Sequence, residues 1–390
     1  MQPTQVNFTR DEEVLAVALE LSGKEWKIAL DDGKRKVPTV CGGVAKHEEP
    51  QRRLQQAVGV IEATKKKWKL PAEVRVVIVY EAGQDGFWIK RGLEAEGYEV
   101  WVTDAASVQV NRQARRAKTD RLDALLLVRA LRGWLRGELD RMRMVQVPSV
   151  EAEGQRHLMR ERGQLQKEIG QHRDRMRKLL QTMGCVTNVD ELGGLLEHGT
   201  VKGADGSALP AGLQQRLVRE CARLQLVQEQ LAALEKTLPE QLPEELRQRI
   251  EQLMQLKAVG PVGASRLLLE LYWRDFNNRR EVGSCVGLAP QPYDSGNSRV
   301  DQGISKAGNR RVRALLIEMA WMWIRYQSQS ELAQWYFKRI SGTGANKRSK
   351  RVAIVAVARR LAILLWRYLK HGVLPKDVAL KPVKVTLQAA

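Results

Sequence analysis

The pattern of apolar and polar positions at the start of the chain predicts strands in a mixed α/β domain. The run VLAVALEL at 14–21 is apolar enough for a buried strand, and EWKIAL at 25–30 follows a Ser-Gly-Lys turn as its hairpin partner. Residues 50–69 have the spacing of an amphipathic basic helix. The β-branched run RVVIVYEA at 75–82 then predicts a central strand.

The same domain continues with a predicted strand–helix–strand unit. A helix is expected over 87–98, where Gly97 stops it, and EVWVTDA at 99–105 is the next strand. Two strands joined by one helix in this way lie parallel in a sheet. TDRLDALLLVRALRGW at 119–134 predicts a further helix with Thr119 as its N-cap.

A change of pattern at Pro148 indicates a long helical segment. Residues 151–182 are polar and helix-forming, and a heptad pattern of apolar positions runs through Leu158, Leu165, Ile169, Met176 and Leu179. Residues 184–210 are rich in glycine and predict a loop, and a helical pattern returns over 211–255. Two long helices around a loop predict an antiparallel coiled-coil hairpin, a spacer or dimerisation arm. A plain helical linker is the alternative.

The last third of the chain is predicted to be mainly helical. Gly260-Pro261-Val262-Gly263 opens a helix, and such a turn can point backbone N–H groups at a phosphate, although an ordinary helix start fits it equally well. Residues 287–311 are the least regular part, and 311–370 are helical with a break at 341–350. The expected segments are an α/β domain at 1–148, a helical arm at 149–252, a helical domain at 253–375 and a loose tail at 376–390.

The overall charge predicts a polyanionic partner. The 390 residues include 65 Lys and Arg against 45 Asp and Glu, which gives a net charge of +20, and nucleic acid is the usual partner of such a protein. No run of 18 or more apolar residues is present, the N-terminus lacks a signal-peptide pattern, and the four cysteines lack metal-site spacing. We expect a cytoplasmic, nucleoid-associated protein without a membrane partner.

The positive charge is concentrated near the C-terminus. From Arg299 to Lys370 there are sixteen Lys and Arg against three acids, a local net charge of +13 in 72 residues. Four tryptophans lie in the same stretch, and basic residues interleaved with aromatic ones suit phosphate contacts and base stacking. For the tryptophans alone, packing in a helical core is the favoured explanation.

Four acidic residues of the α/β domain suit metal chemistry. Glu20 and Glu81 end two predicted strands, and Asp120 and Asp123 lie three apart on one face of a predicted helix. Carboxylates beside apolar strands need compensation, and Mg²⁺ takes hard oxygen ligands that it often shares with phosphates. Acids at a helix start also favour the helix dipole, and a strand-end acid can serve as a cap, so each acid taken singly has a structural explanation. Strand-borne acids followed by an acidic pair on a later helix are the layout of an RNase H or RuvC fold.

A set of motifs resembles a known family. VALELSGKEWKIAL, VIVYEAG, GYEVWVTDAASV, RRAKTDRLDALLL and GLAPQPYDSGNSRVDQGISKAGNRRVRALL together resemble the DEDD-type transposases of bacterial insertion sequences. These proteins are related to the Piv DNA invertases and are guided by a structured bridge, or seeker, RNA. The resemblance covers about residues 14–135 and 253–325, and the order of its motifs is specific.

The resemblance implies a fold, a reaction and partners. It implies a RuvC-like N-terminal domain in which Glu20, Glu81, Asp120 and Asp123 bind Mg²⁺, and a C-terminal domain whose Ser295 forms a covalent phosphoserine link to DNA. The implied partners are double-stranded target and donor DNA, a guide RNA, and further copies of the chain in a dimer or tetramer. The residues suited to phosphate contacts are Lys306, Arg310, Arg311, Arg313, Lys347, Arg348, Lys350 and Arg351.

Two positions of this sequence affect how far the family's site residues apply to it. Glu20 stands where the family normally has aspartate, and its extra methylene moves the carboxylate by roughly an ångström, which matters for octahedral Mg²⁺. No His or Lys lies a few positions before Ser295, so its activation would come from the acidic site of the other domain. Asp-Ser-Gly-Asn also has turn chemistry, and Ser298 is the alternative nucleophile.

Two other functions fit parts of the sequence. A RuvC-like nuclease would hydrolyse DNA through water, with Ser295 structural and no protein–DNA adduct. A non-catalytic nucleic-acid-binding protein would bind in a salt-sensitive way without cleaving DNA. The combination of the four acids with the serine motif favours the recombinase over both.

Overall fold

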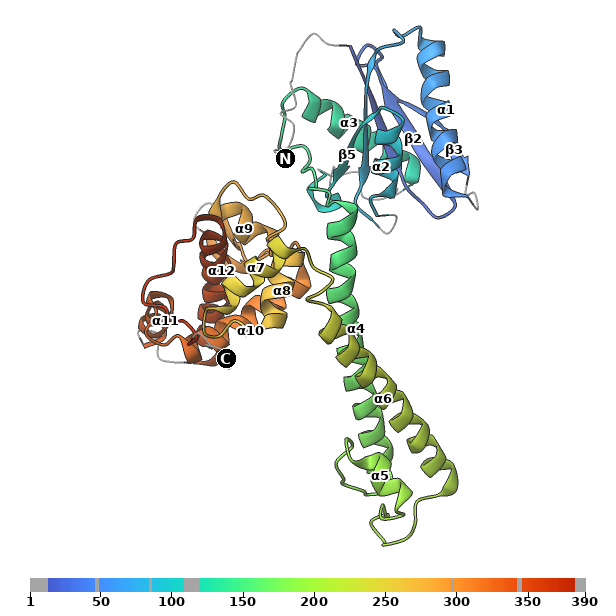
Figure 1. The fold of residues 1–390 in the computed structure, drawn as a ribbon. Helices are drawn as coiled ribbons and strands as arrows, with labels where there is room; N and C mark the ends of the chain where they lie inside the picture. The colour runs from blue at the N-terminus through green and yellow to red at the C-terminus, as the bar shows by residue number, and fades with distance from the viewer. Residues whose placement is uncertain are drawn as a thin grey trace, which may run out of the picture. The chain divides into compact units, whose positions relative to one another are not determined.

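The computed structural model describes residues 13–45, 49–83, 86–108, 119–295, 298–341 and 346–382, without the side chains of residues 42 and 295–301. The chain forms two compact units, Met1–Val147 and Pro148–Ala390 (Figure 1). The helical arm and the C-terminal domain, which the sequence predicts as separate segments, therefore belong to one unit. No helix in the described ranges is both long and apolar enough to span a membrane.

A five-stranded mixed sheet forms the centre of the first unit. Its strands are β1 (Val14–Glu20), β2 (Glu25–Asp31), β3 (Thr39–Ala45), β4 (Arg75–Glu81) and β5 (Glu99–Thr103), in the order β3-β2-β1-β4-β5. The first three strands in sequence pair antiparallel, whereas β4 pairs parallel with both β1 and β5. The predicted hairpin and the parallel strand–helix–strand unit are confirmed, and β3 is an additional strand that the sequence pattern does not predict.

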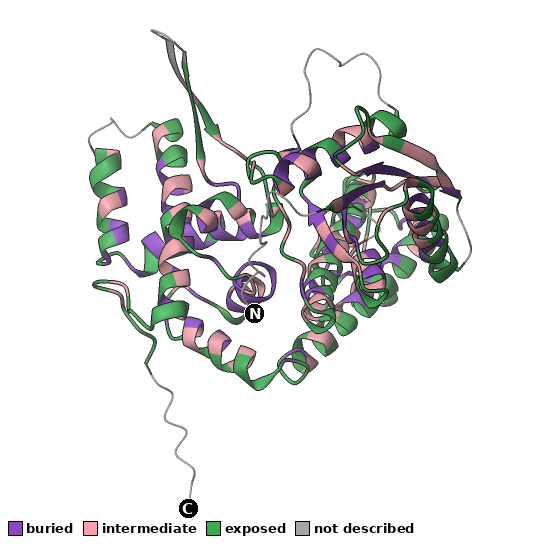
Figure 2. Ribbon diagram, turned by 90° about the horizontal axis from the view of Figure 1, so that it is seen from above, coloured by how far each residue is buried: buried purple, intermediate pink, exposed green. Residues whose placement is uncertain are grey.

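Helices cover both faces of this sheet. The helices α1 (Pro50–Trp68) and α2 (Trp88–Ala95) pack on one face, and α3 (Asp120–Leu135) packs on the other. A short 3₁₀ helix, η1 (Ala105–Ser107), follows β5. Because the central strands are buried on both sides (Figure 2), they consist of nearly continuous apolar residues rather than an alternating pattern.

Two long helices begin the second unit. α4 (Val150–Gln181) and α6 (Ala211–Thr237) pack antiparallel, as the contacts of Arg162 with Glu235 and of Arg175 with Glu220 show, and α5 (Leu192–Glu197) lies in the connection between them. Three of the heptad positions, Leu165, Ile169 and Met176, are buried in the core that the two helices share. The other two, Leu158 and Leu179, are partly buried.

The rest of the second unit is a helical domain with one hairpin of strands. Its elements are α7 (Glu244–Met254), α8 (Pro261–Glu270), α9 (Arg279–Cys285), β6 (Pro290–Ser295), β7 (Ser298–Ile304), α10 (Arg310–Tyr326), α11 (Glu331–Ser341) and α12 (Lys347–His371). The helices share one apolar core, in which Trp323 is fully buried and donates a hydrogen bond to Ser330. Trp321 is 45 % exposed, so the tryptophans of this stretch are not all buried in the core.

Two predictions for this domain need correction. The segment 287–311 is not irregular, because most of it forms the antiparallel β6–β7 hairpin. The expected tail from residue 376 is also partly bound to the domain: the backbone N–H groups of Lys257 and Lys381 donate to the carbonyl groups of Ala379 and Gln255. Residues 383–390 lie outside the described ranges.

Candidate functional site

Two of the four predicted metal ligands end neighbouring parallel strands. Glu20 is the last residue of β1 and Glu81 is the last residue of β4. The register pairs Leu19 with Tyr80, so the two glutamates occupy the next adjacent positions on strands about 5 Å apart. The sheet thus brings together two acids that are 61 positions apart in the sequence.

Both glutamates lie on the face of the sheet that α3 covers. Successive side chains of a strand point to opposite faces, and Ala18 and Val79, each two positions before an acid, belong to the apolar cluster beneath α3. Leu19 and Tyr80 belong to the cluster on the opposite face. The glutamates therefore share one face as well as one edge.

The direction of α3 places its acidic first turn toward that same edge. Near its C-terminal end, the Arg132 Nη2 atom donates to the carbonyl oxygen of Val14 at 3.0 Å and to that of Asp31. Val14 begins β1, so α3 runs antiparallel to β1, and its 16 residues span about 24 Å against about 23 Å for the strand. The start of α3 consequently lies toward the end of β1 that carries Glu20.

Asp120 and Asp123 occupy the first turn of α3, and the predicted N-cap is confirmed. The Thr119 hydroxyl accepts a hydrogen bond from the Leu122 backbone N–H at 3.3 Å. Asp123 is half-buried and lies one turn before the buried Leu127, whereas Asp120 is exposed. The negative charges complement the helix dipole, which explains part of the sequence without any metal.

The four carboxylates do not form a closed metal site as they stand. Within the described ranges, no group of three or more His, Cys, Asp or Glu side chains is close enough to hold an ion. Their chemistry nevertheless suits a hard cation, because all the donor atoms are carboxylate oxygens. Asp31 cannot replace Glu20: it pairs in register with Ala16, away from that edge, and lies 3.6 Å from Arg132.

The two candidate serines face each other across the hairpin backbone. Ser295 ends β6 and pairs with Ser298, the first residue of β7, so the loop between them consists of residues 296 and 297. The two loop residues, and the side chains of both serines, lie outside what the structure describes. The turn predicted for Asp-Ser-Gly-Asn therefore lies partly outside the described ranges. Both candidate serines lie at the same end of the hairpin.

The base of this hairpin is held by closely packed backbone. The Lys306 N–H donates to the Gly287 carbonyl at 3.1 Å, and the Asn309 N–H donates to the Cys285 carbonyl at 3.3 Å. A Cβ atom on Gly287 would lie 2.0 Å from the Ala307 carbonyl oxygen, and one on Gly308 would lie 2.1 Å from that of Cys285. The glycines of the GLAP and SKAGN motifs thus allow two chain segments to come into contact, a role that the sequence pattern does not predict.

Arg313 also stabilises the base of the hairpin. Its Nη1 atom donates to the carbonyl groups of Lys306, at 2.9 Å, and Val286, at 3.2 Å. The sequence predicts phosphate contacts for Arg313, whereas in the structure one of its guanidinium nitrogen atoms is bound to the backbone. This role depends on the positions of carbonyl groups in the folded chain, which no sequence motif encodes, so the sequence alone could not predict it.

The other predicted basic residues gather at two helix starts. Arg310 and Arg311 begin α10, Lys306 lies just before it, and all three are exposed. The second group begins α12 and is also exposed: Lys347, Arg348, Lys350 and Arg351. Neither first turn contains an acid, so cations stand where the helix dipole prefers anions. Both starts are consequently suited to a polyanion.

The N-cap of α10 is positioned by a buried acid. The Asn309 side chain accepts hydrogen bonds from the Arg311 and Val312 N–H groups, and its Nδ2 atom donates to Glu270 Oε2 at 2.9 Å. Glu270, on α8, is 4 % exposed. This contact links the core of the domain to the basic helix that follows the serine hairpin.

Comparisons with known proteins show which family the chain is similar to. A family model described as "Transposase IS116/IS110/IS902 family" matches residues 250–335, and a second one, for DEDD transposases of the IS110 type, matches residues 28–184. A protein described as a transposase, y4rJ of Sinorhizobium fredii, is 35 % identical over 97 % of each chain. The transposase for insertion sequence element IS1328 of Yersinia enterocolitica is 28 % identical over 42 % of this chain and 48 % of its own.

Proposed function

Because the chain belongs to the IS116/IS110/IS902 family of transposases, and therefore binds and recombines DNA, we propose that it cleaves and rejoins strands through a covalent phosphoserine intermediate. The observation that carries the proposal is that Glu20 and Glu81 end adjacent strands, and that the acidic first turn of α3 lies toward the same edge of the sheet. The domain that holds them is proposed to be RuvC-like.

The four acids are proposed to bind Mg²⁺. Glu20 and Glu81 would hold the ion from the sheet, and Asp120 and Asp123 would complete its ligands from α3. When bound, the cation would neutralise charge on the phosphoryl oxygens during transfer. Asp120 is exposed at the start of α3, so its carboxylate is accessible to a cation from solvent.

The serine supplies the chemistry of strand exchange. The Ser295 hydroxyl oxygen bonds to the phosphorus of a DNA phosphodiester, the bond from phosphorus to one deoxyribose oxygen breaks, and the hydroxyl proton passes to that oxygen. A strand hydroxyl from the other DNA partner then attacks the same phosphorus and releases the serine, which recovers a proton. The number of phosphodiester bonds is conserved, so no cofactor energy is required.

The exposed basic residues near the serine hairpin are proposed to hold the DNA beside Ser295. Lys306, Arg310 and Arg311 follow the serine hairpin directly and present cations at the start of α10. The start of α12 provides the second group, and each contact with a phosphate adds salt-sensitive affinity without reading sequence. Arg313 contributes indirectly, since it fixes the hairpin.

Target choice is proposed to depend on a guide RNA, and exchange on an oligomer. The family resemblance and the net charge of +20 support an RNA partner. Exposed apolar side chains on α6, Val218 at 52 % and Leu226 at 54 %, support contact between copies of the helical hairpin. RNA that co-purifies with the protein and survives washing in high salt would test the first point.

The decisive experiment separates strand transfer from hydrolysis. The protein is incubated with its guide RNA, cognate DNA and Mg²⁺, and the products are separated on a denaturing gel. A protein–DNA adduct that disappears in Ser295→Ala but persists in Ser298→Ala supports the proposal. Cleaved ends without an adduct would instead identify a nuclease that uses water, and an adduct in Ser295→Ala would exclude that serine.

A further inference from the structure

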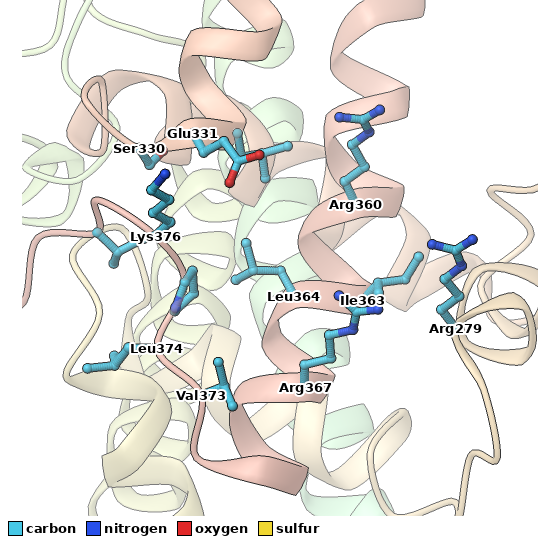
Figure 3. A pocket seen from close by; sticks show the side chains of 13 residues that line it. Arg279, Ser330, Glu331, Arg360, Ile363, Leu364, Arg367, Val373, Leu374 and Lys376 are labelled. Carbon is cyan, nitrogen blue, oxygen red and sulfur yellow. The ribbon is translucent and has the colours of Figure 1, made fainter.

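A cationic cavity lies on the C-terminal domain, in a place that the proposed reaction does not use. Its volume is about 540 Å³, within the usual range for ligand sites. Residues of α9, the start of α11, α12 and the segment after α12 line it, which brings together positions from 279 to 378 (Figure 3).

The charge of the cavity is strongly unbalanced. Arg279, Arg360, Arg367 and Lys376 line it, against the single carboxylate of Glu331 (Figure 3). Within the described ranges none of the four cations forms an ion pair. Burial, with a contribution from nearby Arg339, lowers the pKa of Arg360 from its usual value. Cations held together in this way indicate an anionic ligand.

The floor of the cavity is apolar. Ile363 and Leu364 of α12 face Val373 and Leu374 of the following segment, and the cationic side chains lie around them (Figure 3). Arg360 is stacked on Trp335, with its guanidinium carbon 3.8 Å from the ring centroid, so its plane is held in one orientation. A phosphate alone would not need this floor, whereas a base would pack on it and a fixed guanidinium plane could stack on that base.

We propose that this cavity binds one unpaired nucleotide of a DNA strand, with its base on the apolar floor and its phosphate between Arg279 and Arg367. The proposal rests on family membership, which makes DNA the substrate, but not on the serine mechanism. Strand exchange requires that bases be unpaired, and single-strand binding proteins commonly combine a cationic track with an apolar base platform.

The test measures binding of a fluorescent oligothymidylate to the full-length protein, together with the same strand carrying abasic sites. Arg367→Ala should weaken binding of both strands about tenfold and reduce the slope of log K against log salt by about 0.7, the effect of one lost phosphate contact. Leu374→Ser should weaken only the strand with bases. Leu374 is 48 % exposed, so its replacement leaves the fold intact.

Arg216→Ala is the matched control, because Arg216 is an exposed arginine of α6, outside the cavity. The proposal is overturned if Arg367→Ala binds no more weakly than Arg216→Ala, or if Leu374→Ser weakens the two strands equally. Tight competition by free thymidine monophosphate would overturn it in favour of a small-nucleotide site. Since no cleavage is measured, these outcomes are independent of the role of Ser295.

Discussion

Replacing Gly308 by alanine should detach the serine hairpin from its domain without unfolding the protein. The new Cβ would lie 2.1 Å from the Cys285 carbonyl oxygen, where about 3.3 Å is the normal contact, so the two segments would have to separate by about 1 Å. The φ of +89° at Gly308 is also a region that L-residues adopt only at a cost of about 1–2 kcal/mol.

The separation would break specific hydrogen bonds. Those from the Asn309 N–H to Cys285 and from the Lys306 N–H to Gly287 each contribute about 1 kcal/mol. Together with the backbone strain, the expected loss is about 3–4 kcal/mol. Urea unfolding would measure this loss, and adduct formation, once observed, would report the position of the hairpin.

Gly303→Ala is the control for this prediction. Gly303 belongs to the same hairpin and has a φ of +83°, but a Cβ atom there meets nothing within 4 Å. Its replacement should therefore cost only the backbone strain, about 1–2 kcal/mol. Equal losses of stability in Gly303→Ala and Gly308→Ala would refute the argument that close packing of the backbone explains the glycines of this motif.

Three further changes have defined outcomes. Burial opposes the ionisation of Glu220, but hydrogen bonds from His172 and Arg175 outweigh it and keep the pKa of Glu220 below its usual value. Glu220→Gln should therefore cost about 1–3 kcal/mol in urea unfolding at pH 7, and the difference from the native protein should fade as the pH falls below about 4. A difference that does not depend on pH would contradict this. Arg132→Met removes two partly buried hydrogen bonds and should cost about 2–3 kcal/mol in urea unfolding. Arg129→Met, on the exposed side of α3, should cost under about 0.5 kcal/mol, and similar losses in the two variants would refute the importance of these hydrogen bonds. Mg²⁺ should raise the melting temperature of the native protein but not of Asp123→Asn, and the absence of a shift in both would exclude the proposed metal ligands.

The sequence predicts the first unit well, with one omission. Apolar runs and helical spacing identify four of the five strands and all three helices, because burial on both faces of the sheet leaves a strong signal. β3 escapes detection because TVCGGVA contains two glycines in the middle of the strand, which weaken both its propensity and its alternation. The site acids at strand ends follow directly once the strands are placed.

The β6–β7 hairpin was missed for a different reason. Pro290 and Pro292 disfavour a strand, and β6 and β7 form a sheet only with each other, so neither shows a buried apolar face. The available signal was Gly-Asn between two short runs, a pair of residues that is typical of two-residue hairpin loops. No sequence pattern predicts the cavity near Arg367, because the residues that line it come from four separate segments.

The positive charges of the chain have two different roles, structural ion pairs and proposed DNA contacts, which the net charge of +20 does not distinguish. In the α4–α6 hairpin, arginines pair with carboxylates, as Arg162 does with Glu235 and Arg175 with Glu220, and these charges stabilise the structure. The first turns of α10 and α12 contain cations without any acid, although the helix dipole disfavours cations there. The unfavourable interaction with the helix dipole would be offset by bound phosphates. If these two helix starts contact DNA as proposed, DNA binding should stabilise this domain more than it stabilises the α4–α6 hairpin.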